Sequence, residues 1–443
     1  MTEPSSPGAL ARLKTTLRAL SHRNFRLFFL GQGISLVGTW MQIIAMSWLV
    51  YRLTRSAFLL GLVGFAGQIP TFLFSSLAGV LADRWNRQRM VIITQTLLLI
   101  QASVLAILVL GHWITIWQII ALSIFAGLVN AFDIPIRQSF MVDMVDRKED
   151  LGNAIALNSS LVNAARLVGP SLAGILIALV GEGWCFAINA ASFVAVLAAL
   201  VTMKIERRTD VDLEAKWFPK LKEGFRYAFG FQPIASILLL ISVVSLTGTP
   251  YSVLMPIFAT KILIGGPNLY GALMGMAGCG ALLGAGYLAS RKNALGLGRL
   301  IPSASIIFGT ALIAFSLSHT FWLSLLAMVV VGWGLMVQMA GSNILLQTIV
   351  EDDKRGRVMS FYTMAFMGMA PMGSLLAGTI AARIGAPRTV MLGGICCIVS
   401  GLVFASRLST LRAHVRPIYQ RMGILPEVAL GIQSATQIEP GPE

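Results

Sequence analysis

Three ionisable residues, Asp133, Arg137 and Arg166, lie in or beside stretches that are otherwise apolar enough to cross a membrane. A charge in hydrocarbon is costly, so such residues are expected to pair, to carry protons or to bind a charged ligand. Counted from the ends of their stretches, Asp133 and Arg166 differ in depth by only about 6 Å at 1.5 Å per residue. The sequence therefore predicts that these two side chains meet.

Two interpretations of the predicted pair stay open. In one, Asp133 and Arg166 form a static ion pair that locks two helices together. In the other, Asp133 takes up and releases a proton, which would require burial to favour its neutral form.

No residues in the sequence form a recognisable catalytic or metal-binding set. The four histidines are scattered, and no Gly-rich loop ending in Lys and Ser or Thr is present to hold nucleotide phosphates. We therefore expect no catalytic residue, no metal and no cofactor, and the sequence disfavours an enzyme or an ATP-driven pump. The four cysteines lack metal-type spacing and read as small packing residues: Cys185, Cys279, Cys396 and Cys397.

The elements that position the charges must be membrane helices. Hydrophobic residues make up 56% of the 443 residues, charged residues only 12%, and the mean hydropathy is +0.77. A chain of this composition cannot cover a water-facing surface with polar groups. Apolar runs of about 20 residues recur about twelve times and lack the period of two that barrel strands show. The predicted fold class is an all-α membrane protein with about twelve transmembrane helices.

The second half of the chain repeats the layout of the first. Gly169-Pro-Ser-Leu-Ala-Gly174 returns as Gly373-Ser-Leu-Leu-Ala-Gly378, about 205 positions later, as internal duplication predicts. We expect two pseudo-symmetric six-helix bundles, an architecture typical of transporters. The predicted segments are a basic N-terminal segment at 1–24, bundles at 25–205 and 233–408, a linker at 206–232 and a C-terminal tail at 409–443.

Most of the 34 Lys and Arg residues lie in the two tails and in the loops after the even-numbered helices. Basic residues are retained on the cytoplasmic side, so both termini are predicted to be cytoplasmic. The formal net charge of +15 is then a topology signal and an attraction to anionic membrane lipid, and no nucleic-acid partner is expected. Leucines at helical spacing between Leu10 and Leu20 predict either a helix on the membrane surface or a disordered tail.

A basic loop after the second predicted helix carries the most specific motif, the run Gly79-Val-Leu-Ala-Asp-Arg-Trp-Asn-Arg-Gln-Arg89. It resembles the signature Gly-x-Leu-Ala-Asp-Arg-x-Gly-Arg-Lys of the major facilitator superfamily, which lies between helices 2 and 3. Together with twelve spans and repeated halves, the resemblance covers essentially the whole ordered chain. The superfamily is itself a known example of such repeats.

The resemblance implies a cytoplasmic gate in this loop. Asp83 would cap a helix or pair with a base, and the arginines would hold neighbouring carboxylates. Asn86 stands where the family has Gly, so we expect left-handed backbone geometry there. The alternative is a basic loop that only fixes topology. The predicted gate residues are Gly79, Asp83, Arg84, Arg87 and Arg89.

Arg166 is followed in the fifth predicted helix by Gly169, Pro170 and Gly174. This run is similar to the Gly-Pro motif of the superfamily's antiporters, although the upstream glycines are absent. The glycines permit tight helix packing and Pro170 bends the helix, so a packing kink is the plain alternative. The resemblance implies export rather than uptake. Ser123 stands where the superfamily's proton-linked Arg is expected.

A substrate cavity is expected between the halves, near the middle of the membrane, lined by polar and adaptable side chains. Each candidate has ordinary packing or an interhelical hydrogen bond as its alternative. The methionines of the eleventh helix predict a pliable wall for large amphiphilic ligands. The cavity candidates are Gln32, Trp40 and Gln42 in helix 1, Asn158 in helix 5, Gln338 and Asn343 in helix 10, and Met364 and Met367 in helix 11.

Within the superfamily, runs such as Gly38-Thr-Trp-Met-Gln42 and Asn130-Ala-Phe-Asp-Ile-Pro-Ile-Arg-Gln138 resemble the bacterial branch of enterobactin exporters and macrolide-efflux proteins. The resemblance implies a monomeric, multi-pass protein of the bacterial cytoplasmic membrane that exports siderophores or drug-like compounds by proton antiport. Its partners would be a small-molecule substrate, protons and membrane lipid. An uptake symporter of the same fold, or a membrane scaffold or lipid-handling protein, are the alternatives.

Overall fold

The computed structural model describes residues 17–82, 86–203, 226–227, 229–291 and 295–421. Twelve helices in this part of the chain are long and apolar enough to cross a membrane, from Arg23–Thr54 to Ala386–Ser406. The prediction of an all-α membrane protein is confirmed. The exact bounds of the two predicted bundles stay a prediction, because most of the linker at 206–232 lies outside the described residues.

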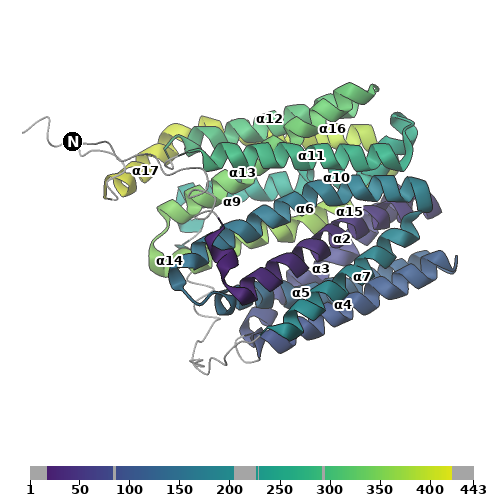
Figure 1. Ribbon diagram of the computed structural model, residues 1–443. Coiled ribbons are helices and arrows are strands. Elements are labelled where there is room, and N and C mark those ends of the chain that lie inside the picture. Colours follow the sequence, from purple (N-terminus) through teal and green to yellow (C-terminus); the bar gives the residue numbers. More distant parts are fainter. Residues whose placement is uncertain (1–16, 83–85, 204–225, 228, 292–294, 422–443) are drawn as a thin grey trace, which may run out of the picture.

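The helices of the two halves run side by side in one elongated bundle, the first half coloured purple to teal and the second teal to yellow (Figure 1). The first half contains α2 (Arg23–Thr54), α3 (Ala57–Ala82), α4 (Arg87–Leu110), α5 (Ile116–Phe140), α6 (Leu151–Val180) and α7 (Glu182–Thr202). The second contains α9 (Gln232–Val243), α10 (Tyr251–Ile257), α11 (Gly266–Ala289), α12 (Leu297–Leu317), α13 (Phe321–Ile349), α14 (Asp352–Thr363), α15 (Met369–Ile384) and α16 (Ala386–Ser406).

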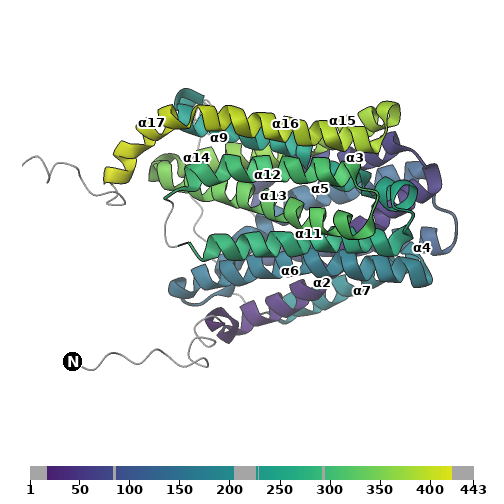
Figure 2. The same ribbon diagram turned by 90° about the horizontal axis from the view of Figure 1, so that it is seen from above.

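The described ends of the chain lie at the same end of the bundle, here named the terminal end (Figure 2). The first is a short 3-10 helix, η1 (Arg18–Ser21), and the last is α17 (Leu408–Arg421). The amphipathic helix α17 occupies the start of the predicted C-terminal tail. Ala19 of η1 is fully buried against the bundle, while Leu17 is 39% exposed. The membrane-surface position of this segment stays a prediction, and residues 1–16 lie outside the described residues.

Two sharp turns repeat between the halves. Gly181 ends α6 and begins α7 with φ +88°, and Gly385 does the same between α15 and α16 with φ +88°. Both glycines adopt a left-handed conformation that other residues avoid. The second turn follows the first at the spacing of the repeated glycine run, so the duplication extends to the backbone of the turns.

The two halves meet through glycines. A Cβ at Gly174 of α6 would lie 2.8 Å from the Cα of Gly271 of α11, and one at Gly378 of α15 would lie 2.8 Å from the Cα of Gly61 of α3. Such small residues allow helix backbones to approach closely in a membrane. All four glycines lie toward the end of the bundle away from the termini, here named the opposite end. The halves are therefore closed against each other at the opposite end.

In the described residues of the second half, three segments of π-helix interrupt the spans. The seventh span contains η4 (Val244–Gly248) and η5 (Phe258–Ile262), and the eleventh contains η6 (Met364–Gly368). The hydroxyl of Ser245 in η4 donates a hydrogen bond to the carbonyl oxygen of Phe366 in η6. The irregular parts of the two spans are therefore joined directly to each other. Segments of π-helix are rare and are frequent at functional sites.

Candidate functional site

Asp133 is almost fully buried between α4 and α5 and accepts three polar contacts. Its Oδ1 accepts hydrogen bonds from Thr94 Oγ1 and Gln95 Nε2, both at 2.8 Å. Its Oδ2 lies 3.2 Å from Nε of Arg137, one helical turn further along α5. These donors stabilise the charged carboxylate and tie the third span to the fourth.

The expected pair of Asp133 with Arg166 is wrong for this conformation. The carboxylate of Asp133 is occupied by Arg137, and the guanidinium of Arg166 lies over the ring of Trp40, with its Cζ 5.3 Å from the ring centroid. Depth along a helix places two residues at one level but does not say which way they point, and the two side chains face different neighbours.

Arg166 and Trp40 meet where α6 packs on α2 and on the other half. A Cβ at Gly169 would lie 2.5 Å from the Cβ of Trp40, so the missing side chain makes room for the tryptophan. A Cβ at Gly278 of α11 would lie 3.1 Å from the carbonyl oxygen of Arg166. Pro170 has no N–H to bond that carbonyl, which is four residues earlier. The half-buried arginine therefore stands at the interface of the two halves, near the middle of its span.

Arg166 has no carboxylate partner among the residues that the structure describes, and its guanidinium lies over the ring of Trp40. A cation over an indole face is stabilised by the ring quadrupole, but its N–H groups remain available to a ligand. The arrangement offers a fixed positive charge beside a large flat apolar surface. This combination suits an anionic compound that also has aromatic or apolar parts.

The predicted gate is only partly described. Asp83 and Arg84 lie outside the described residues, and Gly79 lies in the last turn of α3. Arg87 pairs with Asp143 of the 3-10 helix η2 (Met141–Met144), with Nη1 3.2 Å from Oδ2. The expectation that an arginine of this loop holds a carboxylate is thus met by Arg87, and Asp143 is the partner that sequence reasoning missed.

The left-handed geometry expected at Asn86 is wrong. Asn86 has φ −66° and ψ 110°, and its side-chain oxygen accepts a hydrogen bond from the backbone N–H of Arg89 at 3.0 Å. Asn86 is the N-cap of α4, a position at which Asn is among the preferred residues. The cap explains how an asparagine replaces the glycine of the family motif without backbone strain.

Several predicted cavity residues are engaged inside one half. Gln42 donates to Gln101 Oε1 at 3.0 Å and accepts from Asn189 Nδ2 at 2.8 Å, which joins the first, third and sixth spans. Gln32 is 3% exposed and Gln338 is 0% exposed, so neither lines an open cavity in this conformation. For Gln42 the structure favours the interhelical hydrogen bond. Oε1 of Gln32 and both amide atoms of Gln338 are buried without a hydrogen-bond partner among the described residues, and their place in a cavity stays a prediction.

The remaining cavity candidates are more accessible. Met364 and Met367 of η6 are 44% and 42% exposed, and Gly368 beside them packs against the ring of Phe72 of α3. Asn343 accepts a hydrogen bond from Gln347 at 2.6 Å, and Asn158 is half-buried on α6. The role of the two methionines as a pliable cavity wall stays a prediction.

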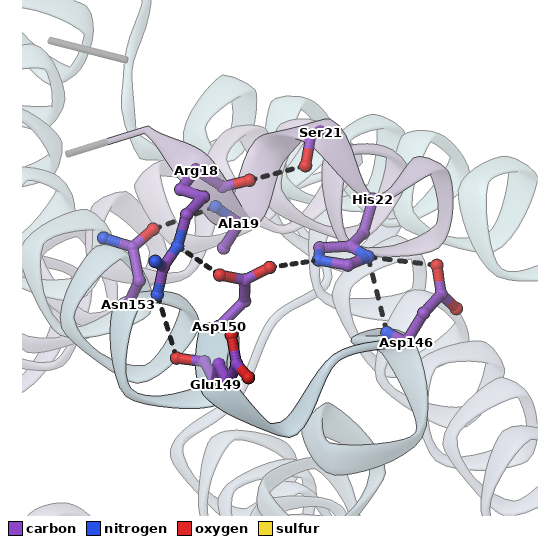
Figure 3. Close-up of polar contacts among 8 residues, drawn as sticks. All are labelled: Arg18, Ala19, Ser21, His22, Asp146, Glu149, Asp150 and Asn153. Carbon is purple, nitrogen blue, oxygen red and sulfur yellow. Dashed lines mark hydrogen bonds and ion pairs between the residues drawn. The ribbon is translucent and has the colours of Figure 1, made fainter. Parts of the chain in front are cut away.

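Sequence reasoning missed a buried polar cluster at the terminal end (Figure 3). Nδ1 of His22 lies 3.0 Å from Oδ2 of Asp146, and its Nε2 lies 2.9 Å from Oδ2 of Asp150. Arg18 pairs with Asp150, and the backbone N–H of Ala19 donates to Asn153 Oδ1 at 2.9 Å. The signal in the sequence was a pair of aspartates in a loop at the otherwise basic end of the protein.

The pKa values of His22 and Asp150 are both shifted within this cluster. Burial disfavours the imidazolium, but the hydrogen bonds and negative charges of Asp146 and Asp150 outweigh it and raise the pKa of His22. The hydrogen bond from His22 lowers the pKa of Asp150, against an opposing effect of burial, and the charges of Arg18 and Arg147 add to the lowering. The cluster fastens η1 to the start of α6, and the two aspartates favour the charged form of His22.

Twelve spans in repeated halves, closed at one end and carrying a charge at their interface, define a transporter of the major facilitator superfamily. The sequence model of a protein family described as transmembrane secretion effector matches residues 14–428, and the chain belongs to this family. The family consists of transporters, so the protein is not an enzyme.

Similar proteins agree with this assignment. The chain is 27% identical over 382 residues to the staphyloferrin A transporter of Staphylococcus aureus, covering 86% of this chain and 95% of that one. It is 23% identical over 409 residues to the enterobactin exporter of Citrobacter koseri, covering 90% and 94%. A solved bacterial homologue of the human lysosomal transporter Spinster, inward-facing and unoccupied, matches with a TM-score of 0.71 at 15% identity, covering 89% and 98%. The predicted superfamily and branch are confirmed.

Proposed function

We propose that this protein exports an anionic, amphiphilic small molecule such as a siderophore across the bacterial cytoplasmic membrane by alternating access. The observation that carries the proposal is Arg166, a cation at the interface of the halves that lies over Trp40 and has no carboxylate partner among the described residues. A lone charge in a span is costly unless a ligand or cavity water compensates it. An anionic substrate would supply the missing partner.

The orientation is part of the proposal. The distribution of Lys and Arg favours a cytoplasmic position for the terminal end. The glycine contacts at the opposite end then close the outer side, so this conformation is the one that receives substrate from the cytoplasm. The gate residues from Gly79 to Arg89 would close the cytoplasmic side in the alternate conformation.

Proton antiport would use Asp133 and Arg137. Protonation of Asp133 removes the charge that holds Arg137 at 3.2 Å and frees the arginine to move. Because Thr94 and Gln95 also bond the carboxylate, the same event loosens the contact of α4 with α5. Coupling of proton uptake to transport would therefore depend on helix packing within the first half and not on the site at Arg166.

The test is transport of iron-free staphyloferrin A and enterobactin by purified protein in proteoliposomes with an imposed proton gradient, with ethidium as a cationic probe. Arg166→Gln is expected to weaken uptake of the anions about 10- to 100-fold through KM, because a charge-assisted contact contributes about 1.5–3 kcal/mol. Arg166→Lys, which keeps the charge, should recover part of the affinity. Transport of ethidium should be spared in both variants.

Vesicles of defined orientation test the direction. Energised inverted vesicles should accumulate the anion and right-side-out vesicles should not, and an uncoupler should abolish accumulation. Accumulation confined to right-side-out vesicles would show an uptake symporter instead. Equal loss of anion and cation transport in Arg166→Gln would show that Arg166 does not bind the substrate and has a packing role instead.

A further inference from the structure

A groove of about 600 Å³ lies at the terminal end of the second half, between α17 and the ends of four spans. Its walls are mostly apolar. They include Ile237 of α9, Leu345 of α13, Phe404 of α16 and Val415 of α17. The volume is in the range of sites that hold small organic ligands. None of the transport residues described above lines this groove.

Three arginines line the same groove. Arg412 and Arg416 lie one turn apart on α17, and Arg299 lies near the start of α12, which faces them. All three side chains are exposed, and none forms an ion pair with a described residue. A spacing of four residues puts Arg412 and Arg416 on one face of α17. The groove therefore has a positive rim that no carboxylate of the described chain neutralises.

The position of α17 puts this groove at the membrane surface. One residue separates α17 from α16, whose 21 residues span the apolar layer, and Figure 2 shows α17 continuing from that span at the terminal end. Leu411 is 5% exposed against the bundle, while Arg412 is exposed. An amphipathic helix with this division of residues is typical of the interface between lipid and water.

We propose that this groove binds an anionic phospholipid. The arginines would hold the phosphate and the headgroup, because a guanidinium matches phosphate oxygens with two parallel N–H bonds. The apolar walls would take one acyl chain, which a soluble phosphate lacks. Basic pockets between membrane helices are known to bind such headgroups. The bound lipid would fasten α17 to α12 and so steady the terminal end of the second half, whatever substrate the protein transports.

The experiment measures lipid binding by native mass spectrometry and by melting temperature in detergent, with the full chain. Phosphatidylglycerol should remain bound and raise the melting temperature, and zwitterionic phosphatidylethanolamine should do neither. The double variant Arg412→Gln with Arg416→Gln should lose about 30-fold in affinity for phosphatidylglycerol, which corresponds to about 2 kcal/mol, or about 1 kcal/mol for each arginine. Arg299→Gln, on a different helix, should lose affinity as well.

The matched control is Arg23→Gln with Arg26→Gln, which removes two exposed charges from the same end of the molecule outside the groove. It should keep the affinity of the wild type. Equal affinity in the α17 double variant and the control would overturn the proposal, as would full binding in Arg299→Gln. Stabilisation by inorganic phosphate as strong as by phosphatidylglycerol would show a soluble-anion site. If another segment of the chain or a second copy filled the groove, the three arginine changes would leave lipid affinity unaltered.

Discussion

The two halves share a helix plan but differ in what holds their helices together. In the first half, ion pairs join separate elements: Arg52 with Glu182, Arg87 with Asp143, and His22 and Arg18 with Asp150. In the described part of the second half, Lys354 pairs with Glu351, three residues away in the same turn.

The second half contains irregular backbone segments, whereas the first half contains ion pairs between its elements. All three described π-helical segments lie there, and the carbonyl oxygens of η4 face glycines on neighbouring helices. A Cβ at Gly373 would lie 2.3 Å from the carbonyl oxygen of Leu246, and one at Gly393 would lie 2.2 Å from that of Thr247. Helices that can shift between α and π spacing bend at low cost. The difference predicts a first half that moves as a rigid unit while Asp133 keeps its charge, and a second half that deforms.

The largest expected effect is at the centre of the rigid half. Asp133→Ala leaves Arg137, Thr94 and Gln95 without their acceptor, and loss of one member of a buried pair typically costs about 3–5 kcal/mol. The melting temperature in detergent should fall far more than for Glu351→Gln, where an exposed pair contributes about 0–1 kcal/mol. Similar losses in the two variants would mean that charge does not hold the first half together.

A double-mutant cycle locates the partner of Asp133. The losses from Asp133→Ala and Arg137→Ala should be strongly non-additive, because each residue is the other's partner. The losses from Asp133→Ala and Arg166→Ala should be nearly additive, because their side chains face different neighbours. Strong coupling of Asp133 with Arg166 would indicate that the two meet in another conformation of the transport cycle.

A smaller effect is expected at the His22 cluster, and it depends on pH. Because the pKa of His22 is raised in the folded protein, its contribution to stability is fully present below about pH 6.5 and is lost as the pH rises through the raised value. For Asp150, whose pKa is lowered, the contribution is present above the ordinary value of 3.8 and is lost as the pH falls through the lowered one. The cluster should therefore hold η1 best in mildly acidic conditions.

The measurement is the difference in melting temperature, and in protease cleavage before α2, between wild type and His22→Gln from pH 5 to pH 9. The difference should be largest between pH 5 and 6.5 and should shrink toward pH 9. His112→Gln removes an exposed histidine near the opposite end and should show no such trend. A difference that stays constant over the whole pH range would show that the charge of His22 does not stabilise the contact.

The spans were predictable because lipid requires every backbone group to bond within its own helix, and length and hydropathy then locate each helix. Tight packing at Gly169 and Gly174 was predictable from the repeated run, but their partners Trp40 and Gly271 were not. The partner of Asp133 could not be predicted from depth alone, because depth along a helix does not give the direction in which a side chain points. The spacing of Asp133 and Arg137 by four residues was visible in the sequence and was the better guide. The π-helical segments had no signal, since they depend on packing against neighbouring spans.

The smallest expected effect tests the deformable half at the bond between η4 and η6. Ser245→Ala removes the hydrogen bond to the carbonyl oxygen of Phe366, which joins the seventh and eleventh spans. Hydrogen bonds between membrane helices contribute about 0.6 kcal/mol on average and at most about 1.7, so the melting temperature should change little. Ser242→Ala is the matched control, because Ser242 bonds at 2.8 Å to the carbonyl oxygen of Leu238 in its own helix.

If the joined π segments bend together during transport, Ser245→Ala should alter the turnover rate in proteoliposomes by more than its small loss of stability predicts, while Ser242→Ala leaves the rate unchanged. Equal rates in the two variants would mean that the seventh and eleventh spans move independently, and the contrast between a rigid and a deformable half would then rest on the ion pairs alone.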